Sequence, residues 1–252
     1  MGVQDSNSFA EAAKNCAHRI PYVPPFFEEA SKQLALDKGA RLLDIACGSG
    51  ELSSGFSQYC SDITAIDQSE KMLEQARSKV PASVSLVQFD LNQPFSLDIG
   101  RFDVITIGRA LRYLNKEPLF KLLEQTLKEA GSMLICGSGL HGSTPWAETY
   151  VRVVRPFQGM SKPIDPSWRE MFVNAPYDAR DVYKATGEIR FSVDDLLNNI
   201  LSYRTFAATV SANLGEVKTQ LTEALRPYFS DENALLGTVV SHGRRYQKKV
   251  AV

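Results

Sequence analysis

Asp44-Ile45-Ala46-Cys47-Gly48-Ser49-Gly50 combines an acid, small residues and two glycines in seven positions. Glycine adopts φ values closed to other residues and lets a ligand approach the backbone closely. A helix that begins after such a turn offers unpaired N–H groups to an anionic or polar ligand. Taken alone, the segment indicates a tight turn with some capacity to bind a nucleotide.

Two further acids follow apolar runs in the same part of the chain. Asp67 comes directly after 63–66, and a carboxylate there can accept hydrogen bonds from both hydroxyls of a ribose. Asp90, with Leu91 beside it, follows 84–89 and could accept an adenine amino group. Either acid could instead serve a turn, with Asp67 capping the one before Ser69. Three suitable groups at consecutive strand ends favour nucleoside binding over three unrelated turns.

The elements that must position these residues alternate between strands and helices. Short apolar runs predict strands, and amphipathic spacing with Ser69 as a cap and Gly131 as a stop predicts helices. The predicted strands are 41–46, 63–66, 84–89, 102–107 and 133–136, and the predicted helices are 26–36, 51–59, 70–79 and 118–130. Alternation of this kind predicts a parallel sheet with right-handed crossovers.

The pattern changes after Gly137. Residues 141–180 are rich in proline and aromatic residues and indicate an insertion of short helices and loops. Such a segment could be a substrate lid or a structural cover for the sheet. The rest of the chain predicts strands at 188–192 and 236–246 and helices at 193–208 and 217–227.

The stretches LLDIACGSGELS, AIDQSEKMLEQAR, QFDLNQPF and FDVITIGRALRYL resemble the class I S-adenosylmethionine-dependent methyltransferases. Within that class the chain is similar to the small-molecule group (methyltransferase type 11) that contains the trans-aconitate methyltransferases. The group's D-x-S-x-x-M-L block stands intact from Asp67 to Leu73, while HRIPYVPP and NNILSYRTFAAT resemble its N-terminal block and C-terminal helix.

The resemblance implies an α/β fold: a Rossmann-like, seven-stranded, mostly parallel sheet with helices on both faces and an inserted helical substrate lid. It implies one methyltransferase domain over 1–252. The parts would be an arm over the cofactor at 1–36, a cofactor-binding core at 37–137, a lid with C-terminal helices at 138–235, and a final strand and tail at 236–252. The implied cofactor is S-adenosyl-L-methionine, and the implied partner is a small-molecule substrate.

Carried over position by position, the resemblance implies a set of cofactor-binding residues: Arg19, Tyr22, Asp44, Ala46, Gly48, Gly50, Asp67, Gln68, Met72, Asp90, Leu91 and Arg109. Asp67 would hold the ribose. Gln68 and Met72 would border the adenine, and Asp90 with Leu91 would read its edge. The glycine turn and Arg109 would lie near the methionine moiety, with Arg19 and Tyr22 closing over the cofactor.

Two departures from the family pattern concern the chemistry. Ala46 stands where the motif has its first glycine, and Arg112-Tyr113-Leu114 stands where a His-Trp-Phe-like triplet usually faces the reacting methyl group. The candidate catalytic residues are Arg112, Tyr113 and His141. A carboxylate acceptor needs no base and could be held by an arginine fork. A hydroxyl or amine acceptor would use a base, for which His18, His141 and Tyr113 are candidates.

Aromatic residues after Gly137 could line the acceptor pocket or simply belong to the core: Trp146, Tyr150, Phe157, Trp168, Phe172, Tyr177 and Tyr203. The basic residues Arg152, Arg155 and Arg169 suggest a pocket that tolerates an anionic or planar substrate. A carboxylate or hydroxyl oxygen is slightly favoured over nitrogen as the acceptor.

Composition excludes several other classes. The 28 Lys+Arg and 29 Asp+Glu give a net charge of −1, which disfavours a nucleic-acid substrate. No apolar run is long enough for a membrane span, and the scattered cysteines and histidines favour reduced thiols in a cytoplasm over a metal site. Two alternatives stay open: a protein that binds the cofactor without transferring a methyl group, and an NAD-binding oxidoreductase. The missing third glycine of the dinucleotide motif speaks against the latter.

Overall fold

The computed structural model describes residues 15, 18–93, 98–158, 170–230 and 233–249, which form two compact units. The core unit is built from Tyr22–Ser138, Pro163–Ala185 and Ser241–Val252. The helical unit is built from Met1–Pro21, Gly139–Lys162 and Thr186–Val240. The predicted arm at 1–36 is therefore divided between the two units, and the single-domain layout stays a prediction.

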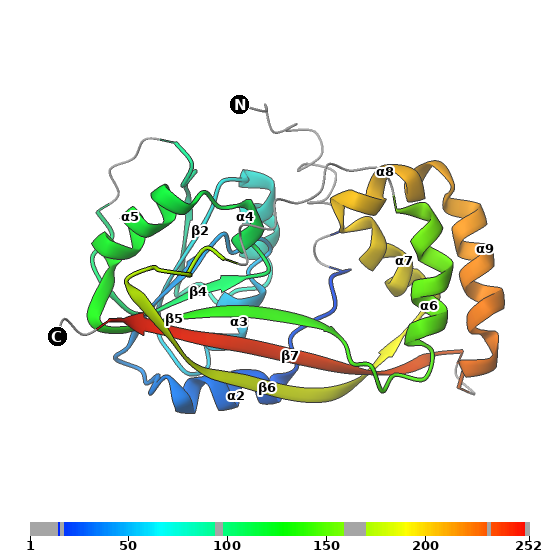
Figure 1. Cartoon of the computed structure of the whole chain (residues 1–252), viewed down its shortest axis with the longest axis horizontal. Helices are drawn as coiled ribbons and strands as arrows, with labels where there is room; N and C mark the ends of the chain where they lie inside the picture. Colours follow the sequence, from blue (N-terminus) through cyan, green and yellow to red (C-terminus); the bar gives the residue numbers. More distant parts are fainter. Residues whose placement is uncertain (1–14, 16–17, 94–97, 159–169, 231–232, 250–252) are drawn as a thin grey trace. The chain divides into compact units, whose positions relative to one another are not determined.

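Within the described residues one sheet has seven strands in the order β3-β2-β1-β4-β5-β7-β6 (Figure 1). The strands are β1 (Arg41–Ile45), β2 (Asp62–Asp67), β3 (Val84–Gln88), β4 (Phe102–Gly108), β5 (Leu127–Leu140), β6 (Tyr177–Phe191) and β7 (Leu235–Lys248). The pairs β2–β3, β1–β2, β1–β4 and β4–β5 are parallel, whereas β7 runs opposite to β5. The predicted mostly parallel, Rossmann-like sheet is confirmed.

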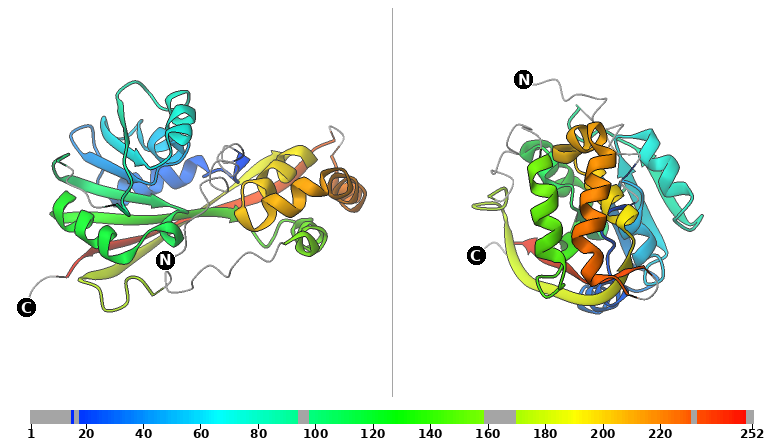
Figure 2. Two further views of the ribbon diagram at one scale, coloured as in Figure 1. Left: turned by 90° about the horizontal axis from the view of Figure 1, so that it is seen from above. Right: turned by 90° about the vertical axis from the view of Figure 1, so that its right-hand side faces the viewer.

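Helices cover both faces of the sheet in the core unit (Figure 2). They are α2 (Pro24–Gln33), α3 (Glu51–Phe56), α4 (Glu70–Arg77) and α5 (Lys116–Thr126), with a 3₁₀ turn, η2, at Leu111–Tyr113. Alternation along β1 sends Leu43 and Ile45 into one apolar cluster with Leu119 and Leu123 of α5. The intervening Asp44 points to the other face and meets Ser53 of α3. The sheet thus has an apolar α5 face and a second face that carries the acid at the end of β1.

The helical unit consists mainly of α6 (Ala147–Val154), α7 (Val193–Leu201), α8 (Arg204–Ala212) and α9 (Leu214–Leu225), with 3₁₀ turns η3 (Arg155–Phe157) and η5 (Arg226–Tyr228). Ser192 begins α7 with a capping box that Asp195 completes. Trp146 is 1% exposed, packs edge-on against Phe191, and donates its indole N–H to the Leu236 carbonyl at 2.8 Å. This unit therefore has its own buried aromatic centre.

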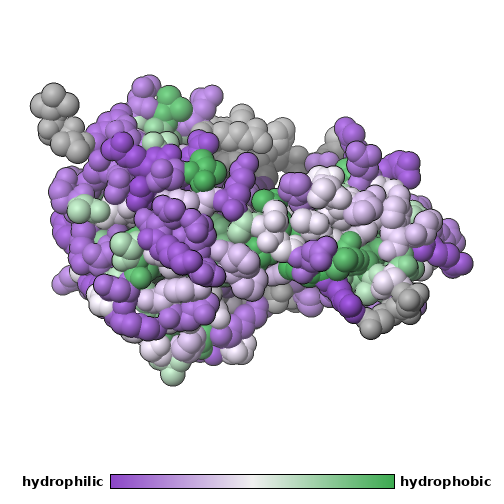
Figure 3. Space-filling model, turned by 90° about the horizontal axis from the view of Figure 1, so that it is seen from below, coloured by the Kyte–Doolittle hydropathy of each residue, from purple (hydrophilic) through white to green (hydrophobic). Residues whose placement is uncertain are grey.

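The surface is polar over most of the face in Figure 3, with hydrophobic residues in small groups. The large hydrophobic side chains that are exposed come from separate elements: Val151, Val173, Val182, Leu214, Tyr228 and Leu236. Isolated exposure of this kind is normal for a folded protein. No helix in the part of the chain that the structure describes is long and apolar enough to cross a membrane.

Four predicted elements are corrected by the structure. The helix predicted at 118–130 ends at Thr126, and β5 begins at Leu127, six residues before the predicted strand. The predicted strand 188–192 is the end of the fifteen-residue β6. The helix predicted at 193–208 is broken into α7 and α8, because Ser202 turns its hydroxyl back onto the Asn199 carbonyl at 2.6 Å and Tyr203 is extended.

Candidate functional site

The turn between β1 and α3 holds the glycines in two different roles. Gly48 has φ +57°, and a Cβ built on it would meet no heavy atom within 4 Å in the described structure. Gly50 has φ +78°, and its Cβ would lie 2.8 Å from Val80 and 3.1 Å from Ala76. Gly48 therefore presents bare backbone that a ligand can approach, whereas Gly50 is required for close packing against the end of α4.

Ala46 lies at the start of the same turn with φ +54°. This is the left-handed region, where the Cβ of an L-residue is crowded at a cost of about 1–2 kcal/mol. Ala46 therefore keeps a backbone conformation that favours glycine, which is the residue that the family motif has at this position.

Asp44 is fully buried beneath this turn. Its Oδ2 accepts from the Ser53 hydroxyl at 2.6 Å, and its Oδ1 accepts from the Thr106 hydroxyl at 2.9 Å. Burial raises the pKa of the Asp44 carboxyl to about 6, although the two hydroxyl donors act in the opposite direction. Asp44 therefore ties β1 to β4 and α3 and holds the base of the turn.

Asp67, at the end of β2, connects the glycine turn to α4. Its Oδ2 accepts from the Gly48 N–H and its Oδ1 from the Ser69 N–H, both at 2.9 Å. Ser69 in turn caps α4 by accepting from the Met72 N–H at 3.4 Å. Burial raises the pKa of the Asp67 carboxyl. Each carboxylate oxygen keeps a second lone pair, so the turn-forming role and ribose binding are compatible.

The residues expected around the adenine lie on consecutive strand ends. Asp90 forms a local turn by accepting from the Asn92 N–H at 2.9 Å, and its neighbour Leu91 is 4% exposed in the core cluster. Gln68 is exposed at the end of β2, and Met72 is half-buried in the first turn of α4. The Phe89 N–H donates to the Asp67 carbonyl at 2.9 Å, which holds the ends of β2 and β3 together.

Arg109, after β4, is held by an ion pair with Glu51 at the start of α3. Its Nη1 also donates to the Ser138 hydroxyl at 3.0 Å, and its guanidinium lies 4.7 Å from the Tyr22 ring centroid. Glu51 accepts from the Tyr22 N–H at 2.8 Å through its other oxygen. The arginine expected beside the methionine moiety is thus fixed by an acid, and both hold Tyr22 in place.

The Tyr22 hydroxyl is buried, and burial raises its pKa well above the ordinary value. No described residue forms a hydrogen bond with this hydroxyl. A Cβ built on Gly108 would lie 3.0 Å from the Tyr22 hydroxyl oxygen. The glycine therefore lets the backbone of β4 pass close to this hydroxyl. A buried hydroxyl without a protein partner usually serves a ligand or a water molecule.

Sequence reasoning missed four of the side chains that organise this site: Glu51, Ser53, Thr106 and Ser138. Two of them carried a readable signal. Glu51 is an acid in the first turn of the helix that follows the glycine turn, and Thr106 is a polar residue between two isoleucines in the buried part of a strand. Ser53 and Ser138 show no signal in sequence, because serine is common in helices and loops.

The catalytic candidates are distributed over both units. Arg112 is exposed and Tyr113 half-buried in η2, where the guanidinium lies 6.0 Å from the tyrosine ring centroid. His141 belongs to the helical unit, as does Arg19. Arg19 donates to the Ser202 carbonyl at 3.4 Å. No group of histidine, cysteine and acidic side chains within the described ranges could hold a metal ion.

A cavity of about 470 Å³ lies within the helical unit, lined by α6, α7, α8 and the segments before them. Tyr150, Tyr203 and Arg155, from the predicted acceptor residues, line it together with His141. Arg152 lines a neighbouring cavity. Trp146 is core, and Phe172 and Tyr177 pack in the core unit instead. Trp168 and Arg169 lie outside the described residues.

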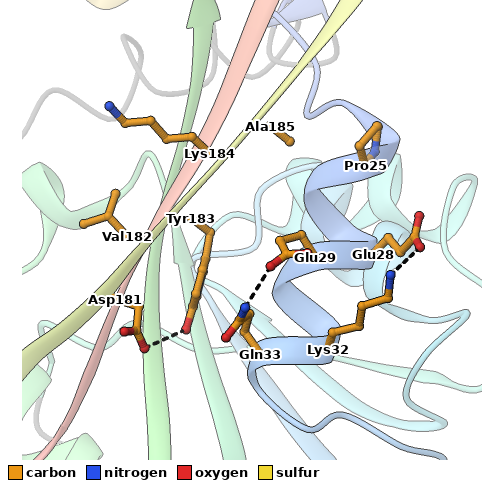
Figure 4. Close-up of a pocket in the computed structure, with 10 residues that line it drawn as sticks. All are labelled: Pro25, Glu28, Glu29, Lys32, Gln33, Asp181, Val182, Tyr183, Lys184 and Ala185. Atoms are coloured by element: carbon orange, nitrogen blue, oxygen red, sulfur yellow. Dashed lines mark hydrogen bonds and ion pairs between the residues drawn. The ribbon is translucent and has the colours of Figure 1, made fainter.

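A second cavity, of about 580 Å³, lies in the core unit between α2 and β6 (Figure 4). Its polar groups pair with one another: Lys32 with Glu28 at 2.6 Å, and Gln33 with Glu29 at 2.8 Å. None of the predicted site residues lines it. Because these pairs lie on exposed side chains of a surface helix, they mark an ordinary surface groove.

Comparison with known proteins agrees with the site. Residues 42–131 match a family described as a methyltransferase domain. A demethylmenaquinone methyltransferase of Staphylococcus aureus is 33% identical over 112 residues, which are 42% of this chain and 45% of that protein. The chain spans about half the length of the curated relatives it matches.

Two solved structures share the fold. One, provisionally described as a type II methyltransferase from Anaeromyxobacter dehalogenans, has a TM-score of 0.67 at 16% identity and covers 91% of this chain and 97% of its own. The other is a SAM-dependent methyltransferase from Thiobacillus denitrificans in complex with S-adenosyl-L-homocysteine. It has a TM-score of 0.52 at 21% identity and covers 96% of this chain and 98% of its own.

Proposed function

We propose that the chain is a class I S-adenosylmethionine-dependent methyltransferase and that it transfers a methyl group from this cofactor to a carboxylate or hydroxyl oxygen of a small molecule. The cofactor would bind in the core unit. A small-molecule acceptor is supported by the cavity of the helical unit and by the relative whose name specifies a small-molecule substrate.

The observation that carries the proposal is the joint geometry of Gly48 and Asp67. Gly48 presents bare backbone, and Asp67 is fixed against it with lone pairs to spare. The carboxylate can therefore accept ribose hydroxyls while the turn lies against the rest of the nucleoside. The Tyr22 hydroxyl, buried and without a partner among the described residues, supplies a further polar group that a ligand can satisfy. The residues present fit S-adenosylmethionine.

When bound, S-adenosylmethionine supplies a methyl group on a positively charged sulfur, which is already activated for displacement. The chain therefore has to bind, align and exclude water. Asp67 and Asp90 would hold the nucleoside by its hydroxyls and amino group. Tyr22, fixed by Glu51 and lying on the Arg109 guanidinium, would cover the methionine end. Gln68 and Met72 would border the adenine.

The acceptor oxygen decides whether a base is needed. A carboxylate is ionised at neutral pH and forms the new O–C bond with no proton to remove. A hydroxyl must lose its proton, for which Tyr113 or a histidine would have to accept it.

Calorimetry with S-adenosylhomocysteine and NAD⁺ tests the cofactor, and a methyl-labelled donor with a panel of organic acids and phenols tests transfer. We expect binding of S-adenosylhomocysteine alone, and label in an acid or phenol. Tight NAD⁺ binding without S-adenosylhomocysteine binding would overturn the proposal. Saturable cofactor binding without turnover on any acceptor would instead indicate a protein that keeps the fold and has lost transfer.

A further inference from the structure

The walls of the cavity in the helical unit are mainly apolar. They are made by side chains from the segment before α2, the end of β5, and α6 to α8: Ile20, Leu140, Val151, Val154, Ile200 and Phe206. Val151 is 52% exposed, so this wall reaches the surface of the unit. At about 470 Å³ the cavity falls within the range of about 300–1,000 Å³ that is typical of small-molecule sites. Its occupant should have an apolar body.

The charged groups of the lining are all of one sign. Arg155 lines the cavity, and no aspartate or glutamate is among the described lining residues. Arg155 is exposed and forms no ion pair with any residue that the structure describes. Arg19 lies outside the lining, with its guanidinium 5.8 Å from the Tyr203 ring centroid, and adds a second positive charge nearby. An anionic group is therefore the ionic ligand that this lining favours.

The neutral polar groups of the lining differ in what they can still offer. Asn199 is already satisfied, since its Nδ2 donates to the His18 carbonyl at 3.3 Å and its Oδ1 accepts from the Tyr150 hydroxyl at 3.5 Å. His141 differs, because both contacts of its Nδ1 are to Ser143: it accepts from the N–H at 3.2 Å and, in the same tautomer, from the hydroxyl at 2.7 Å. In the neutral ring the proton then lies on Nε2, so the free nitrogen of His141 donates. Like Arg155, it can bind an acceptor oxygen.

We propose that this cavity binds the methyl acceptor, that the acceptor is an apolar molecule with one carboxylate, and that Arg155 determines the preference for the acid. The proposal deepens the proposed function and rests on it. In the transfer, a carboxylate oxygen forms the bond to the methyl carbon as the carbon–sulfur bond breaks, and the electron pair of that bond stays on sulfur. No proton is released, which agrees with a His141 nitrogen that donates.

The test uses two matched pairs of probes with the full chain: trans-cinnamate with cinnamamide, and octanoate with octanamide. Each pair keeps the apolar body and removes the charge. Calorimetric titration of the wild type should show the acids binding about tenfold or more tightly than the amides, as expected for one charge-assisted contact. Equal affinity of acids and amides, or no binding of the acids, would overturn the assignment of the acid.

Arg155→Gln should remove the preference, and Arg155→Lys should keep part of it because the charge stays. Arg152→Gln is the matched control, since Arg152 lies in the last turn of α6, just before Arg155, but lines only the neighbouring cavity. If Arg152→Gln lost the preference and Arg155→Gln kept it, the residue assignment would be wrong. Arg155 is exposed, so its replacement should leave the fold intact.

S-adenosylhomocysteine affinity, measured in every variant, separates the two proposals. We expect it to be unchanged by all three substitutions. Normal S-adenosylhomocysteine binding without any preference for acids refutes the acceptor assignment and leaves the methyltransferase proposal standing. Failure to bind S-adenosylhomocysteine refutes the proposed function whatever the acids do. With a methyl-labelled donor, the label should enter a base-labile ester of the bound acid, and label in an acid-stable, base-stable product would contradict a carboxylate acceptor.

Discussion

The Asp67 carboxylate accepts the backbone N–H of Gly48 at 2.9 Å, which fixes the glycine turn to the end of the neighbouring strand. The same carboxylate accepts the Ser69 N–H, so one acid sets the turn after β1 and the start of α4 together. A side chain with both tasks brings the cofactor-binding elements into register before any ligand arrives, which lowers the ordering cost of binding.

Asp67→Asn should weaken S-adenosylhomocysteine binding about 30- to 700-fold, equivalent to about 2–4 kcal/mol for the charge-assisted hydrogen bonds that are lost. Calorimetric titration measures the change. Asp62→Asn is the control, because Asp62 begins the same strand and pairs with Arg41 at the opposite end. Unaltered affinity in Asp67→Asn would refute the ribose-binding role.

Asp44 predicts an unusual pH dependence of stability. Its folded-state pKa of about 6 lies above the unfolded value of 3.8, so the folded protein binds the proton more tightly. The penalty for the buried charge is present above pH 6 and is relieved as the pH falls toward 4. Relative to Asp44→Asn, which cannot titrate, the wild type should gain about 2–3 kcal/mol between pH 7 and pH 4.

Urea denaturation of both proteins at several pH values measures this difference. Because all other titrating groups are shared, the comparison removes acid-sensitive pairs such as Lys128 with Asp103. A stability difference that is constant between pH 7 and pH 4, or that falls, would show that folding does not raise the pKa of the Asp44 carboxyl.

The core sheet could be predicted from sequence because its strands are short, apolar and bounded by turn residues. The boundary between α5 and β5 could not be predicted in this way. Leu127 packs in the same buried cluster as Leu119 and Leu123, so its position satisfies helical spacing although its backbone pairs with Phe102 in the sheet. The local sequence fits a helix and a strand equally well at Leu127, and pairing with the neighbouring strand determines which one forms.

Most of the edge strand β6, from Tyr177 to Gly187, was not predicted for a related reason. Only Tyr177, Tyr183 and Phe191 are buried along its fifteen residues, and charged side chains cover its outer face. Polar edge strands are favoured because they discourage pairing with other chains, and this removes the apolar alternation by which strands are recognised. The same limit applies to the site. The acids at the strand ends could be predicted from sequence, whereas the ion pair of Arg109 with Glu51 could be identified only from the folded structure.

The ion pair between Glu51 and Arg109 predicts a stability effect that an exposed pair lacks. Their side chains are 29% and 16% exposed, and Glu51→Gln would leave the guanidinium partly buried without its counter-charge. We expect a loss of about 1–3 kcal/mol in the free energy of unfolding. Glu70→Gln is matched, because Glu70 also begins a helix, α4, and pairs with Arg77 in a more exposed setting.

Glu70→Gln should cost no more than about 0.5 kcal/mol, as exposed pairs usually do. Both acids lie in the first turn of a helix, so the contribution of the helix dipole cancels in the comparison. Chemical denaturation of the two variants gives the values. Equal losses would mean that the Arg109 pair is no more than a surface interaction.

Ala35 ends α2 in a left-handed conformation, with φ +51°. The Ala35 N–H donates to the Lys32 carbonyl and the Leu36 N–H to the Ser31 carbonyl, which is the hydrogen-bond pattern of a Schellman cap. Glycine at such a position removes about 1–2 kcal/mol of strain from the folded state. Part of this gain is offset because glycine also increases the entropy of the unfolded chain. Because the Ala35 side chain is exposed, little packing is lost when it is removed.

Ala35→Gly should therefore raise the free energy of unfolding by about 0.5–1 kcal/mol. Ala35→Val should lower it, because a β-branched side chain is least tolerated at positive φ. Urea denaturation of the two variants decides the point: stabilisation by valine, or destabilisation by glycine, would mean that the cap does not hold this conformation in solution.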